Sequence, residues 1–266
     1  MKNYKYKILV LSDLNKMART TLKSSVSLAN MIDAKIELFH VKEHINIINT
    51  DNQLSAMRIL NEEQNKTKKE IEALVNTVSK EYEVEIDYNF SFGNIKDEIS
   101  DYIESSQPDI IVLGQRDSPP FQLIGDSITL FVLKLFNGVI MISSNENALV
   151  PNEKMSLGVL NGSNSTFDTE FSKDLITHTT TPLISFKIIN SQKVQDENAS
   201  INGEKLVEYV FEQNDNAMTT LSSYLKKNSI NLLYVDRAKN KTTNAKQISL
   251  REVVNKLNVS LLVSRV

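Results

Sequence analysis

An internal repeat limits the folds open to this chain more than any other feature of its sequence. The segment YKILVLSDLN at 6–15 overlies KMSLGVLNGS at 154–163, an offset of 148 residues that carries Asp13 onto Asn161. A later block, DIIV at 109–112, overlies NLLY at 231–234 at an offset of 122. Repetition in the same order indicates two copies of one structural unit. The smaller second offset predicts that the second copy lacks about 26 residues from its middle.

Short apolar runs alternate with segments of helical periodicity in the first copy. Strands separated by helices form parallel βαβ units with right-handed crossovers. The sequence therefore predicts an α/β fold of two tandem, open, parallel-sheet domains of the Rossmann-like type. The expected strands are 7–11, 36–41, 84–90, 109–114 and 139–142, and the expected helices are 16–32, 54–80, a segment from Ile95 that ends before Pro108, and one that precedes residue 139.

The second copy is expected to form the smaller domain. Its missing residues match the long helix in the middle of the first copy, so the second domain should be trimmed by about one helix. The chain should then cross from strand 183–189 to strand 205–211 through a polar loop. We assign the first domain to residues 1–147 and the second to 153–266, joined by a linker around Pro151.

Composition excludes several classes of protein. Hydrophobic residues make up 41% and charged residues 24% of the 266, which is typical of a globular chain. A net charge of −3 without a long basic run argues against nucleic-acid and membrane partners. No segment approaches the roughly 18 apolar residues of a membrane span, and Ile8–Leu11 is too short for a signal peptide. The absence of cysteine excludes disulfides and thiolate sites and fits a cytoplasmic location.

Candidate ligand contacts lie beyond the carboxyl ends of the expected strands, where open parallel sheets bind ligands. The first strand is followed by Asp13, and the second ends in His40 and Val41. An IIVLG strand at 110–114 leads into a loop that carries Gly125. This arrangement resembles the universal stress protein family, and because it recurs the chain resembles a tandem member of that family.

The resemblance also implies a binding site. Nucleotide-binding members carry a G-x2-G-x9-G-[S/T] loop, whose glycines let backbone amides approach phosphates at a helix start. It further implies adenine contacts at Asp13 and Val41, and AMP, adenosine or ATP as the ligand. The candidate nucleotide-binding residues are Asp13, Val41, Gly114, Gln115, Arg116, Gly125, Asp126 and Ser127.

The loop departs from the family pattern at two carboxylates. Asp117 stands at the second glycine position, and Asp126 stands where the small hydroxyl residue belongs. Carboxylates that face a triphosphate lower its affinity unless a metal bridges them, so we expect an intact adenosine half and a degraded phosphate half. In the second copy Asp236 replaces Gly114 and no glycine follows, so no phosphate site of this type is expected there.

Each candidate also has a purely structural interpretation. Asp13 would cap the following helix as readily as it would contact a ligand. The two loop glycines would serve tight turns, and Asp126 or Ser127 would cap the next helix. Arg116 would be an exposed surface charge.

No pattern of catalytic or metal-ligating residues is recognisable. His40, His44 and His178 are scattered, and the chain has no H-E-x-x-H, G-x-S-x-G or Walker lysine motif. The sequence therefore predicts a non-catalytic, cytoplasmic stress-response or regulatory protein with a degraded adenine-nucleotide pocket in its first domain. Two alternatives stay open: a scaffold that binds an unknown protein partner without nucleotide, and an ATP-hydrolysing member of the superfamily.

The resemblance implies how the two domains meet. Members of the family pair their domains through the last strand, which here means Val139–Ser143 and Ser260–Val266. The chain would then form an intramolecular pseudo-dimer, and a homodimer of the whole chain stays open. The apolar run Leu261–Val263 would promote aggregation if it formed an unpaired edge of the sheet.

Overall fold

The computed structural model describes residues 3–43, 53–115, 128–162, 169–179, 182–189, 206–214, 216–236 and 250–264. The first half consists of β1 (Tyr6–Ser12), α1 (Ala18–Ile32), β2 (Ala34–Lys42), α2 (Gln53–Tyr82), β3 (Ile86–Phe92), α3 (Ile95–Ser106), β4 (Ile110–Gly114), α4 (Ile128–Leu135) and β5 (Val139–Ser143). The second half consists of β6 (Leu157–Leu160), α5 (Glu170–Thr177), β7 (Leu183–Ile189), β8 (Leu206–Glu212), α6 (Ala217–Lys227), β9 (Leu232–Asp236), α7 (Leu250–Lys256) and β10 (Ser260–Ser264).

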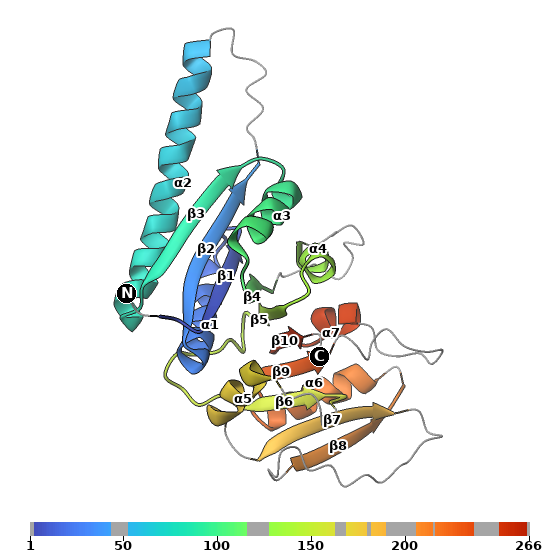
Figure 1. Ribbon diagram of the computed structural model, residues 1–266. Coiled ribbons are helices and arrows are strands. Elements are labelled where there is room, and N and C mark those ends of the chain that lie inside the picture. The colour runs from blue at the N-terminus through green and yellow to red at the C-terminus, as the bar shows by residue number, and fades with distance from the viewer. Residues whose placement is uncertain are drawn as a thin grey trace.

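The ten strands of the described residues form one sheet, in the order β3-β2-β1-β4-β5-β10-β9-β6-β7-β8 (Figure 1). Neighbouring strands are parallel except β5 and β10, which are antiparallel. The α/β fold and the parallel units are therefore confirmed, and the expected strands and helices lie within a few residues of the observed ones. The polar loop expected between β7 and β8 lies outside the described residues, although the two strands are parallel neighbours.

The overlay of the two copies at an offset of 148 is wrong by one residue. Leu11 pairs with Phe39 across β1 and β2, and Leu160 pairs with Phe186 across β6 and β7. All four side chains face the same core layer. Leu160 therefore corresponds to Leu11 at an offset of 149 (160 − 11), and Phe186 to Phe39 at 147 (186 − 39). A slip of one residue moves every side chain of a strand to the opposite face of the sheet.

The corrected register changes the counterpart of Asp13. Asn161 corresponds to Ser12, and Gly162 corresponds to Asp13. The offset of 122 is confirmed, because Leu113 pairs with Leu11 as Val235 pairs with Leu160. The second half therefore has no carboxylate at the position of Asp13.

The core lies on both faces of the sheet and runs through both halves. Helices α1, α2 and α5 cover one face, and α3, α4, α6 and α7 cover the other. On the first face Met141 of β5 and Leu262 of β10 belong to one buried cluster. On the second face Ile140, Leu261 and Val263 belong to another. Burial of these side chains stabilises the junction between the halves as well as each half.

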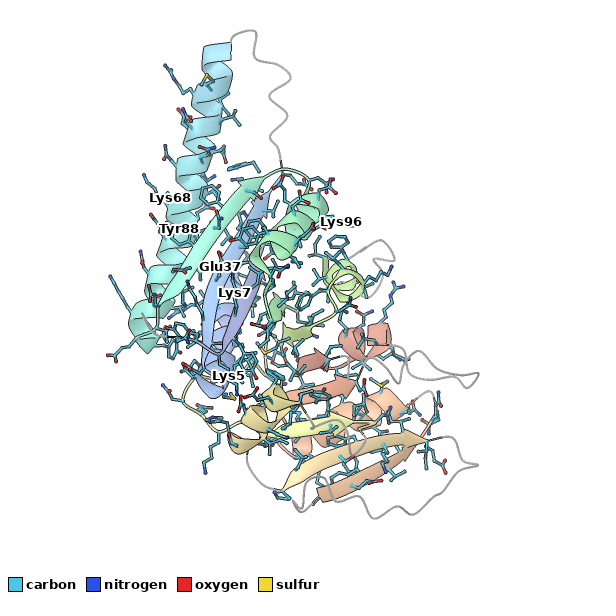
Figure 2. All side chains as sticks on the ribbon, viewed as in Figure 1. Lys5, Lys7, Glu37, Lys68, Tyr88 and Lys96 are labelled. Atoms are coloured by element: carbon cyan, nitrogen blue, oxygen red, sulfur yellow. The ribbon has the colours of Figure 1, made fainter. Side chains whose placement is uncertain are left out.

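The expected terminal strands meet at this junction. Ile142 pairs with Leu261, and Met141 pairs with Leu262. A second contact joins the halves beyond the sheet, where Lys5 Nζ lies 2.6 Å from an oxygen of Asp174 in α5 (Figure 2). The apolar segment Leu261–Val263 is therefore covered by strands on both sides, with β5 on one and β9 on the other.

Helix α2 is the longest element and extends beyond the sheet (Figure 1). Its buried residues Thr67, Ile71, Val75 and Val78 form one stripe that packs on β2 and β3. Tyr88 of β3 points toward the helix, where its hydroxyl donates to Glu72 at 2.8 Å (Figure 2). Within the described ranges, none of the helices combines the length and the apolar character that a bilayer crossing requires.

Candidate functional site

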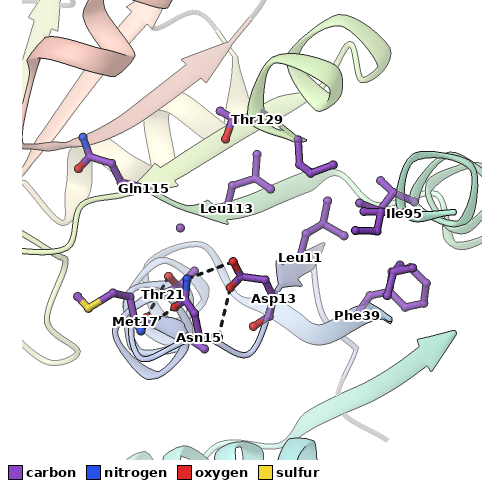
Figure 3. Close-up of a pocket in the computed structure, with 16 residues that line it drawn as sticks. Leu11, Asp13, Asn15, Met17, Thr21, Phe39, Ile95, Leu113, Gln115 and Thr129 are labelled. Carbon is purple, nitrogen blue, oxygen red and sulfur yellow. Dashed lines mark hydrogen bonds between the residues drawn. The ribbon is translucent and has the colours of Figure 1, made fainter. Parts of the chain in front are cut away.

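A hollow opens at the carboxyl ends of β1, β2 and β4 (Figure 3). These strands lie side by side in the order β2-β1-β4. From β1 the sheet extends through β2 on one side and through β4 on the other, so the strand order reverses direction at β1. Such a topological switch point is where open α/β sheets bind ligands. The hollow encloses about 710 Å³ of empty space when the solvent in its open mouth is included.

Apolar side chains form most of the wall of this pocket. Leu11, Phe39 and Leu113 project from the three strands, and Ile95 and Ile128 come from the first residues of α3 and α4. The ring of Phe39 stacks on Tyr102 of α3, with centroids 3.8 Å apart and planes 5° from parallel. This stacking holds one flat apolar surface at the pocket wall.

Asp13 lies at the polar side of the pocket, in the turn from β1 to α1. Its carboxylate accepts from the backbone N–H of Asn15 at 3.3 Å and from the Asn15 side chain at 3.1 Å (Figure 3). Leu14 has a φ of 55°, and its N–H donates to the Ser12 hydroxyl at 3.1 Å. The N-cap of α1 is Met17, without a side-chain cap bond, so the interpretation of Asp13 as a helix cap is wrong.

Val41 and His40 lie on opposite faces at the end of β2. Val41 lines the pocket, whereas the His40 side chain is buried on the other face of the sheet. His40 Nδ1–H donates to the carbonyl of Ser12 at 2.8 Å and so ties the end of β2 to the end of β1. Burial lowers the pKa of His40, which therefore favours its neutral form.

Gly114 ends β4 beneath the pocket. A Cβ atom at this position would lie 2.7 Å from the Thr21 hydroxyl oxygen of α1, so any side chain here would displace Thr21. The next residue, Gln115, donates its backbone N–H to Ser143 at 2.8 Å. Its side chain points away from Asp13 (Figure 3) and donates from Nε2 to the carbonyl of Leu257 at 3.0 Å.

The structure thus brings four of the candidate residues together at one pocket: Asp13, Val41, Gly114 and Gln115. The other four, Arg116, Gly125, Asp126 and Ser127, lie outside the described residues, as does Asp117.

Sequence reasoning missed the apolar wall. Leu11 lies two residues before Asp13, and Phe39 lies two before Val41, so the two-residue period of a strand places each pair on one face. That period could have identified both. Ile95 and Ile128 carry no such signal, because the helix starts reach the pocket only through the tertiary fold.

Charge is sparse in the described part of the pocket. Asp13 is the one ionisable side chain among the described residues that line it, so these residues supply no cation to neutralise a phosphate. No three His, Asp or Glu side chains of the described ranges gather as a metal site would require. The arrangement suits a flat, largely apolar ligand with hydrogen-bonding groups at one edge.

The second half does not reproduce this site in its described residues. Gly162 replaces Asp13, and Asp236, 6% exposed, replaces Gly114. Tyr234 replaces Val112 and is fully buried, with its hydroxyl in hydrogen-bonding reach of Ser264 and Ser172. The second half therefore lacks the carboxylate of the first site, and a buried carboxylate stands where the first half has a glycine.

Comparisons with known proteins agree with the fold. The model of the universal stress protein family matches residues 5–138, just over half of the chain. A universal stress protein from Archaeoglobus fulgidus DSM 4304 is 13% identical over 98% of this chain and 96% of its own, with a TM-score of 0.68. A functionally unknown protein from Pseudomonas aeruginosa PAO1 is 11% identical over 98% of this chain and 92% of its own, with a TM-score of 0.57. No curated protein matches the chain by sequence.

Proposed function

Because the chain belongs to the universal stress protein family, we propose that it is a non-catalytic stress-response protein whose first half binds an adenine nucleoside or nucleotide. The observation that carries this proposal is the convergence of Asp13, Val41 and Gly114 on one pocket at the switch point of the sheet. As part of the same proposal, we assign the protein to the cytoplasm.

The pocket offers complementary surfaces to an adenine ring. Leu11, Phe39 and Ile95 supply apolar contact for its faces. The Asp13 carboxylate lies at the polar side of the pocket, and a carboxylate there can accept a hydrogen bond from an exocyclic amine. Backbone pairing between β1 and β2 ends at Ser12 and His40, so Val41 lies just beyond the last residue of β2 that pairs with β1.

The absence of a cation among the described lining residues favours a ligand with few phosphates. The Asp13 carboxylate would repel a phosphate placed beside it, and the loop carboxylates Asp117 and Asp126 would add to that repulsion. We therefore expect adenosine and AMP to bind at least as well as metal-free ATP.

A matched pair of variants tests the site. Val41→Phe places a bulky ring in the pocket wall. Ile188→Phe places the same ring at the corresponding position of β7, at an offset of 147 (188 − 41). Calorimetry with adenosine should show at least a tenfold loss of affinity for Val41→Phe, with Ile188→Phe retaining wild-type affinity.

Two results would contradict the proposal. Equal adenosine binding by Val41→Phe and the wild type would place the ligand elsewhere. No binding of adenosine, AMP or ATP by the wild type, with or without magnesium, would favour the protein-binding scaffold. Release of ADP from ATP by the purified wild type, lost in Val41→Phe, would favour the hydrolase.

A further inference from the structure

The Gln115 side chain donates hydrogen bonds to backbone carbonyls at the carboxyl end of a helix in the other half of the molecule. The last carbonyls of an α-helix have no partner within the helix. At the end of α7, Gln115 Nε2 lies 3.0 Å from the carbonyl oxygen of Leu257 and 3.5 Å from that of Val254. A residue of β4's carboxyl end therefore caps the last helix of the second half.

The turn from α7 to β10 is held by further residues of the first half. Ser144 Oγ donates to Asn258 Oδ1 at 2.7 Å, and Asn147 Nδ2 donates to the Asn258 carbonyl at 2.6 Å. The backbone N–H of Ser144 donates to Ser260 Oγ at 3.1 Å. We call Gln115, Ser144, Asn147, Asn258 and Ser260 the α7 collar.

Gln115 is the member of the collar that also belongs to the pocket. Its backbone follows Gly114, which packs against Thr21 in the pocket. Its N–H bonds to Ser143 while its side chain reaches α7, so both ends of the residue are held. Asn147 belongs to the collar but does not line the pocket.

We infer that the second half supports the ligand pocket of the first, with Gln115 as the positioning residue, so that pocket occupancy and the docking of α7 stabilise each other. This inference rests on the proposed function. Linkage requires the coupling to be reciprocal: if α7 holds the end of β4 in place for a ligand, the ligand holds α7 in place through Gln115. The second half would thereby act on the site of the first through the contact between α7 and Gln115.

The test compares Gln115→Met with Asn147→Ala in the full chain. Methionine keeps the length of the glutamine side chain but cannot donate to the α7 carbonyls. Asn147→Ala removes a collar bond away from the pocket. The probe is adenosine, the affinity is measured by calorimetry, and hydrogen–deuterium exchange follows residues 11–21 and 250–257.

In the wild type, adenosine should slow exchange in both segments. Gln115→Met should lose the ligand-dependent protection of 250–257 and bind adenosine about fivefold or more weakly. Asn147→Ala should keep both the protection and the affinity.

Protection of 11–21 without protection of 250–257 in the wild type would overturn the inference and leave the proposed function standing. Equal loss of affinity in both variants would also overturn it, because a general loss of stability would explain that result. If adenosine protects neither segment in the wild type, the proposed function fails and the inference fails with it. The wild-type measurement decides even where Gln115→Met does not fold.

Discussion

At the residue scale, one buried imidazole reinforces the pairing between the ends of β1 and β2. His40 donates to the Ser12 carbonyl, one residue before Asp13, and Lys42, Asp13 and Glu70 are the charged groups that act on it. Because burial lowers the pKa of His40, the unfolded chain binds its proton more readily than the folded chain does. The stability that neutral His40 contributes is complete above a pH of about 6.5 and declines as the pH falls through the folded-state pKa.

Acidification below pH 6.5 should lower the free energy of unfolding of the wild type. We expect a smaller decrease in His40→Asn, because asparagine keeps a donor for the Ser12 carbonyl and does not titrate in this range. Urea unfolding at several pH values measures it. His178, exposed at the end of α5, provides a matched histidine-to-asparagine control. An unchanged slope in His40→Asn would show that other groups cause the acid sensitivity.

A second prediction at this scale concerns the two carboxylates that depart from the family loop. Replacing Asp117 with Gly and Asp126 with Ser should raise ATP affinity more than adenosine affinity. Carboxylate–phosphate repulsion costs roughly 1 kcal/mol per close pair at high dielectric, and only ATP carries the phosphates that experience it. Calorimetry of the wild type and the double variant, with and without magnesium, measures both. Tight binding of metal-free ATP by the wild type would rule out this explanation.

At the scale of elements, the two halves differ most where α2 lies. In the first half α2 covers β2 and β3, and the side chains beneath it include Leu38 and Phe90. On the corresponding face of β7 and β8, Lys187 and Glu208 form an ion pair of 3.1 Å. Charged side chains need solvent, whereas apolar ones need a covering layer. The ion pair therefore suits a face that lacks a helix, although Val210 of β8 lies on the same face and is 53% exposed.

At the scale of the whole molecule, β10 is an internal strand that joins two halves with shared cores. Deletion of residues 260–266 removes the partner of β5 and of β9 together. Two apolar edges would then be exposed, and exposed edges promote aggregation. We expect the truncated chain to aggregate or to unfold at a much lower temperature than the wild type.

Thermal unfolding and light scattering measure this outcome. Deletion of 265–266 alone is the control, because it leaves β10 whole. If the longer truncation stayed soluble with unchanged stability, the pairing of β5 with β10 would not be what holds the halves together.

The amino-acid sequence alone determined the number and order of the elements, and its resemblance to the family implied which strands meet at the junction. Apolar runs, helical periodicity and the repeated order of segments are local signals, and Val139–Ser143 needs no tertiary information to be recognised as a strand. The same signals placed Asp13, Val41 and Gly114 at strand ends, and these three residues do line one pocket.

Only the tertiary structure decided the register of the second copy and the partners across the halves. Strands buried on both faces, such as β1 and β6, have no alternation of apolar and polar residues, so a shift of one residue leaves the apolar match unchanged while it reverses the faces. The bond from Gln115 to Leu257 joins residues 142 positions apart. No local preference encodes such a contact, because it forms only when the pairing of β5 with β10 brings the two halves of the sheet together.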